Sequence, residues 1–192
     1  MRDASPDLPR PMTLPALQGY VREMVNARGF TRDLNEILIL LVEEVGELAR
    51  EFENSVRFSE RFDRRNFSHE IVDVFLYLLD VANGFSLELN PCFDRPDGGG
   101  APPPLNRLAE PPPKGDPAPP PKMLVVALAG KIGELATAVR KQWKGRVEPQ
   151  AVQEPIAAAI NLLFRLAGHF RMDFEAALAE KEKLNASRTW AY

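Results

Sequence analysis

The chain is poor in the side chains that bind soft metal ions. Its 192 residues include one cysteine, Cys92, and two histidines, His69 and His169. A single cysteine cannot form an internal disulfide, and neither histidine has a partner at the spacing of zinc ligands. A disulfide-stapled scaffold and a zinc site are therefore excluded. A di-iron bundle is also excluded, because the sequence has no Glu-x-x-His motif. We expect His69 to lie near a helix start, and nothing supports a nucleophilic role for Cys92.

The chain also lacks an excess of positive charge and any long apolar run. The formal net charge is −3 at pH 7, which leaves no basic footprint for nucleic acid. No apolar run approaches the ~20 residues that span a bilayer, and the first residues lack a secretory apolar segment. Together with the single cysteine, this predicts a cytoplasmic protein that binds neither nucleic acid nor membrane.

Two acidic clusters lie within apolar segments of helical periodicity. The first contains Glu43, Glu44 and Glu47, and the second contains Glu70 and Asp73. Spacings of three and four residues place the side chains of each cluster on one helix face. Because carboxylates repel one another in an apolar environment, they need a bound cation or raised pKa values. All-oxygen ligands predict a hard cation, Mg²⁺ or Mn²⁺.

The residues around the clusters favour buried helices. The run 37–42 is apolar throughout, and we expect its helix to be covered on every side. Around the second cluster, apolar residues leave one polar line, formed by Glu70, Asp73, Tyr77 and Asp80. Since carboxylates are rarely buried without a partner, this line predicts a site. The alternative for the first cluster alone is a solvated helix face.

The sequence predicts an all-α fold, a helical bundle of two halves joined by a Pro-rich linker. Residues 1–12 form a flexible tail in this prediction, and residues 13–90 form the half with the acidic site. Residues 91–122 contain twelve of the eighteen prolines, which predicts an extended linker without regular structure. Residues 123–192 form the second helical half.

Three helices are expected in the first half. The first has Thr13 as its N-cap and ends at Gly29. The second covers about residues 35–54. The third covers about residues 68–84, with Ser68 as its N-cap.

The second half repeats the first without its acids. Residues 130–136 align with residues 43–49, but Gly130 and Lys131 replace the first two glutamates, and of the acids only Glu134 remains. We expect an internal pseudo-dimer whose second half contributes packing surface and no metal site. The alternative is a coincidental match between two helices rich in Leu and Ala.

Lys181, Asn185 and Arg188 share one face of the last predicted helix, because they lie at positions i, i+4 and i+7. They are candidates for binding phosphate, and the alternative is a solvated helix end that complements the helix dipole. Tyr77 is a candidate for stacking on a nucleoside or for core packing. Asn83 is a candidate for recognising a base edge or for ending its helix before a glycine.

The order Glu43-Glu44-x-x-Glu47, a spacer and Glu70-x-x-Asp73 resembles the EExxE…ExxD signature of the MazG-type all-α nucleoside triphosphate pyrophosphohydrolases. Dimeric dUTPases, dCTP pyrophosphatases and phosphoribosyl-ATP pyrophosphatases belong to the same superfamily. The resemblance implies a bundle, usually dimeric or higher, that binds Mg²⁺. It also implies water attack on the α-phosphorus of a nucleoside triphosphate, which yields a monophosphate and pyrophosphate.

The resemblance implies roles for individual residues. Glu43 and Glu44 would be the catalytic residues. Glu43 would either join the metal ligands or orient the attacking water. Lys181 and Arg188 belong to a family-like K-x-x-x-N-x-x-R pattern and would steady the β- and γ-phosphates. The implied metal ligands are Glu44, Glu47, Glu70 and Asp73.

The expected function is therefore hydrolysis of a dUTP- or dCTP-type nucleotide in nucleotide-pool house-cleaning, by a protein that we expect to be a homodimer. The fused second half departs from the family pattern and leaves the number of active sites open. An alternative is a catalytically silent interaction protein, or a metal or nucleotide sensor, on the same scaffold.

Overall fold

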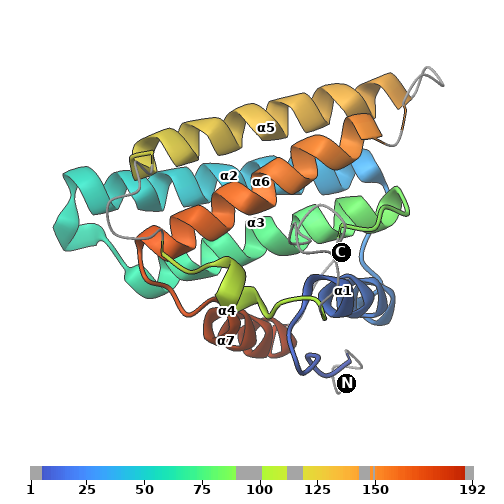
Figure 1. Ribbon diagram of the computed structural model, residues 1–192, viewed down its shortest axis with the longest axis horizontal. Helices are drawn as coiled ribbons and strands as arrows, with labels where there is room; N and C mark the ends of the chain where they lie inside the picture. The colour runs from blue at the N-terminus through green and yellow to red at the C-terminus, as the bar shows by residue number, and fades with distance from the viewer. Residues whose placement is uncertain (1–5, 90–100, 112–118, 143–147, 149, 189–192) are drawn as a thin grey trace.

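The computed structural model describes residues 6–89, 101–111, 119–142, 148 and 150–188 (Figure 1). This part of the chain is all-α, as predicted. The elements are α1 (Leu14–Arg28), α2 (Leu34–Arg57), the 3₁₀ turn η1 (Ser59–Arg61), α3 (Arg64–Gly84), α4 (Leu105–Leu108), α5 (Pro121–Gln142), α6 (Gln150–His169) and α7 (Phe174–Ala186).

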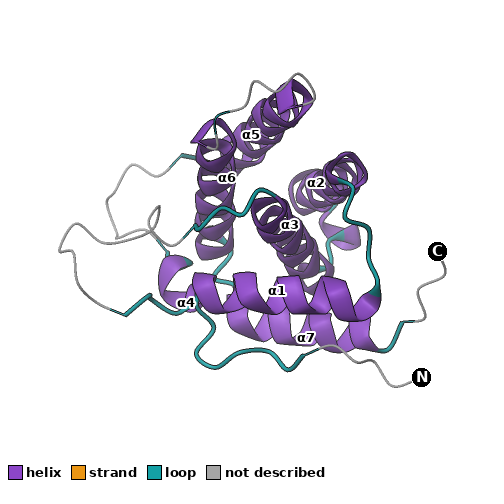
Figure 2. Cartoon of the chain, turned by 90° about the vertical axis from the view of Figure 1, so that its right-hand side faces the viewer, coloured by secondary structure: helices purple, strands orange, loops and turns teal. Residues whose placement is uncertain are grey.

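Helix α3 is the centre of the molecule. It packs against α2 and α6 in the bundle, and against α1 and α7, which lie side by side across one side of that bundle (Figure 2). The pair α5–α6 from the second half packs on the pair α2–α3 from the first through contacts between α2 and α5 and between α3 and α6. Phe75 of α3 is fully buried, and its ring lies 5.8 Å from that of Phe164 and 5.1 Å from that of Phe174.

The first two helices lie where the sequence predicts them, within a few residues at each end. Thr13 is the N-cap residue of α1, although its side chain makes no capping hydrogen bond, and Gly29 ends α1 in the left-handed conformation at φ 67°.

The expectation that α2 is covered on every side is wrong. Ile39 and Val42 are 68% and 54% exposed, because a run of six apolar residues is longer than one helical turn and must project side chains in every direction.

The start of α3 differs from the prediction. Asp63 caps the helix by accepting hydrogen bonds from the backbone N–H groups of Arg65 and Asn66 at 2.8 and 3.3 Å. Ser68 lies inside the helix and donates its hydroxyl to the carbonyl of Arg64. Both residues are good N-caps, and the earlier one begins the helix because the four residues after it are compatible with helix.

The Pro-rich linker is not extended throughout, which corrects the prediction. Residues 101–111 include the short helix α4, in which Leu105 is fully buried and its N–H donates to the carbonyl of Met12, itself fully buried. Asn106 binds the start of α7, because its amide donates to Asp173 and accepts from the N–H of Glu175. This segment therefore connects the two halves. Cys92 lies outside the described residues.

Replacing Gly168 by alanine should test this packing. A Cβ atom at Gly168 would lie 2.8 Å from the carbonyl oxygen of Glu110 and 2.9 Å from that of Ala109. We expect a loss of about 1–3 kcal/mol of unfolding free energy, because the backbone of the linker would have to move. Gly130→Ala is the matched control, since its Cβ would meet nothing within 4 Å and alanine favours helix. Urea denaturation compares them, and equal stabilities would contradict the packing of the linker on α6.

Candidate metal centre and adjoining pocket

Glu44 and Glu47 of α2 and Glu70 of α3 form a carboxylate cluster. Each offers one oxygen, and these oxygens all lie within 4.8 Å of one another. The structure thus brings together three of the four predicted metal ligands from two helices. Glu70 is 5% exposed, and its Oε2 atom is buried without a hydrogen-bond partner in the described part of the chain. A buried carboxylate oxygen without a donor fits the coordination of a hard cation.

The electrostatics of the carboxylate cluster also fit a cation. Burial raises the pKa of Glu44 to about 8, with further contributions from the charges of Asp73 and Glu70. Burial and the Asp73 charge raise the pKa of Glu70 to about 7. A divalent cation among these groups would favour their ionised forms.

Asp73, the fourth predicted ligand, lies beside the cluster but forms an ion pair with Lys181 of α7. Both side chains are nearly buried, at 13% and 10% exposure. Burial raises the pKa of Asp73, and the Lys181 charge opposes this effect. Helix α7 therefore folds over the acidic site. In this structure the ammonium of Lys181 contacts the carboxylate that was predicted to bind metal.

The structure does not bring Glu43 and Asn83 to the cluster. Glu43 is exposed, because neighbouring residues on a helix diverge by about 100°. Asn83 donates to the carbonyl of Gln18 at 2.9 Å and accepts from Arg22 at 3.5 Å, so that it connects the end of α3 to α1. His69 is buried near the start of α3, with its Nε2 atom 3.3 Å from Glu180.

Glu51 is a candidate ligand that sequence reasoning missed. It lies one turn after Glu47 on α2, and its Oε2 atom is buried without a hydrogen-bond partner among the described residues. Its charge contributes to the raised pKa of Glu70. The spacing of four residues from Glu47 was the available signal, but Glu51 also fits the sequence pattern of a solvated helix face.

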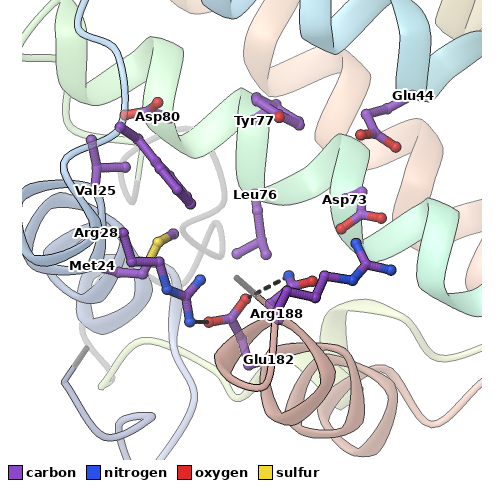
Figure 3. Close-up of a pocket in the computed structure, with 12 residues that line it drawn as sticks. Met24, Val25, Arg28, Glu44, Asp73, Leu76, Tyr77, Asp80, Glu182 and Arg188 are labelled. Atoms are coloured by element: carbon purple, nitrogen blue, oxygen red, sulfur yellow. Dashed lines mark hydrogen bonds and ion pairs between the residues drawn. The ribbon is translucent and has the colours of Figure 1, made fainter. Parts of the chain in front are cut away.

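A pocket adjoins the cluster between α1, α3 and α7 (Figure 3). Glu44 and Asp73 lie at one end, and Asp80, Val25 and Met24 lie at the other. The cavity has a volume of about 140 Å³, close to the roughly 150 Å³ of an engineered cavity that binds benzene, so it can hold one six-membered ring. Its wall also includes Tyr77, Arg188 and Asn185, three of the predicted substrate-binding residues.

Glu182 of α7 lines this pocket and is the centre of a hydrogen-bond network. Its carboxylate accepts hydrogen bonds from the hydroxyl of Tyr20, from Arg28 at 3.1 Å and from the amide of Asn185 at 3.2 Å. Arg28 and Glu182 are each 5% exposed at the side chain. Sequence reasoning missed this network, because its partners on α1 are more than 150 residues away in the chain.

Removal of metal should make stability depend on pH. The unfolded chain releases the protons of Glu44 and Glu70 near pH 4.5, whereas the folded chain holds them to about pH 8 and 7. The free energy of unfolding without metal should therefore fall as pH rises between these values. Millimolar MgCl₂ should raise the melting temperature more at a pH of about 8 than at about 5.5, because protonated carboxyls bind metal poorly. Thermal melts measure this, and equal or absent effects of MgCl₂ at both pH values would count against the site.

Comparisons of the chain with protein-family models, curated proteins and solved structures found no match. In the described part of the chain, no helix combines the length and apolar character needed to cross a membrane. The chemistry of the cluster and its pocket is therefore the basis for assigning a function.

Proposed function

We propose that the protein is a nucleoside triphosphate pyrophosphohydrolase that depends on Mg²⁺ or Mn²⁺. The observation that carries this proposal is the position of Glu44, which belongs to the carboxylate cluster and also lines the pocket. A ligand in the pocket would therefore touch the metal site. The EExxE…ExxD resemblance supports the same reaction.

The charges of the site suit a triphosphate only with a cation present. Carboxylates and phosphates repel, and a divalent ion held by Glu44, Glu47 and Glu70 would neutralise both and lower the pKa of an attacking water. Arg188 lies beside Asp73 in the pocket (Figure 3), where its guanidinium would contact phosphate oxygens. The apolar side chains at the other end would cover the nucleoside.

Glu44 is the residue best placed to hold the nucleophile, because its carboxylate lies between the cluster and the pocket. In the proposed reaction, a water oxygen bonds to the α-phosphorus and the bond from that phosphorus to the bridging oxygen breaks. The water proton passes to a carboxylate, and pyrophosphate leaves. The exposed Glu43 is less suited to this role.

A dUTP- or dCTP-type substrate, a cytoplasmic location and a homodimer belong to the same proposal. The candidate surface for a second copy is formed by two exposed apolar side chains of α2, Ile39 and Val42.

One observation favours the alternative of a silent or sensing protein. The ammonium of Lys181 already compensates the charge of Asp73 without any metal, so part of the negative charge of the site is balanced by the protein itself. Turnover separates the two functions. A panel of nucleoside and deoxynucleoside triphosphates with MgCl₂, assayed for pyrophosphate release, should give metal-dependent turnover of at least one substrate. Binding without release of pyrophosphate would favour the sensor.

A further inference from the structure

The polar line of α3 continues past the metal site into the pocket. Asp73, Tyr77 and Asp80 all line the pocket and follow one another along the helix (Figure 3). Seven residues of helix span about 10 Å, so Asp73 and Asp80 are separated by roughly the length of a nucleotide from its α-phosphate to its base. If phosphates lie at Asp73, the base lies at Asp80.

Within the described part of the chain, Asp80 is an acceptor without a donor partner. Its side chain is partly exposed and lines the pocket, and no hydrogen bond or ion pair reaches it from the described residues. Burial raises its pKa to about 6, an effect that the charge of Arg32 opposes. Val25 and Met24 lie at the same end of the pocket (Figure 3), and their apolar side chains offer Asp80 no donor. A carboxylate that lines a cavity without a donor from the described residues can accept a hydrogen bond from a ligand bound there.

We infer that Asp80 recognises the exocyclic amino group of cytosine and makes the pocket select cytosine over uracil nucleotides. An ionised carboxylate only accepts hydrogen bonds, and Asp and Glu side chains accept from the N4 amino group of cytosine. Uracil has a carbonyl oxygen at the same place, which the carboxylate would repel. The small cavity favours a pyrimidine over a purine. This inference rests on the proposed function, since it uses the phosphate end to orient the base.

Asp80→Asn tests the inference at pH about 7.5, where the carboxyl of the wild type is mostly ionised. We expect the wild type to prefer CTP to UTP by at least about tenfold in kcat/KM, and dCTP to dUTP likewise. The variant should lose this preference, because the asparagine amide can donate to the uracil carbonyl. Glu23→Gln is the control: it removes one charge at an exposed position of α1 and should keep the wild-type ratio.

Binding of CMP and UMP, measured by calorimetry, keeps the inference separate from the reaction. Tighter binding of CMP, lost in Asp80→Asn, would support base selection even if no triphosphate were hydrolysed, an outcome that would defeat only the proposed function. Turnover of CTP and UTP at equal rates would overturn the inference and leave the proposed function standing. An equal loss for both bases in Asp80→Asn would also overturn it, since it would place a sugar hydroxyl at Asp80.

Discussion

Glu47→Gln should reduce pyrophosphate release by at least about a hundredfold, because even partners outside the ligand shell of a metal change affinity or activity by 10- to 100-fold. Glu134→Gln should leave release close to that of the wild type. The two glutamates are aligned in the predicted internal repeat, and each forms an ion pair across three residues. Glu47 pairs with Arg50 at 3.0 Å, and Glu134 pairs with Lys131 at 2.8 Å.

The comparison is well matched, since exposed pairs of this kind contribute only about 0–1 kcal/mol. Both variants should therefore melt close to the wild type without metal. Kinetic assays over a range of MgCl₂ concentrations should show weaker metal binding for Glu47→Gln alone, as a higher MgCl₂ concentration at half-maximal activity. Equal losses in the two variants would contradict a metal site confined to the first half.

Truncation before Lys122 should abolish activity and make the fragment aggregate or oligomerise. The cut removes Phe164 and Phe174, which pack on Phe75, and so exposes the apolar face of α3 that α6 and α7 cover. It also removes α7, which carries Lys181, and the residue Arg188, which follows the end of α7.

Size-exclusion chromatography and the pyrophosphate assay measure the outcome for the fragment. The uncut chain with Gly130→Ala, which alters the second half without removing any contact, serves as its control. A fragment that is monomeric, folded and fully active would show that the second half is not part of the structural unit.

The pattern of residues predicted the helices of the first half and the polar line of α3, because local periodicity determines both. On α3 the apolar positions are buried, and Asp73, Tyr77 and Asp80 alone in the span 70–82 are partly exposed, as the line of polar residues indicated. The same local reasoning brought Glu44, Glu47 and Glu70 together, since the two helices that carry them are neighbours in sequence.

Features that depend on distant contacts could not be predicted in this way. The helix α4 forms in a Pro-rich segment because Leu105 is buried and bonded to Met12, and because Asn106 binds Asp173. The prediction of an extended linker without regular structure is therefore wrong for residues 101–111, and their deletion should destabilise the protein. The network around Glu182 was likewise hidden, because a glutamate among charged residues of a terminal helix is usually solvated.

Hydrolysis in ¹⁸O-labelled water tests the central claim most directly. After turnover of the triphosphate that is hydrolysed fastest with MgCl₂, the products would be separated and their masses measured by mass spectrometry. The proposed attack at the α-phosphorus predicts one labelled oxygen in the nucleoside monophosphate and none in pyrophosphate. Label in pyrophosphate or in inorganic phosphate, or no turnover of any triphosphate with either metal, would contradict it.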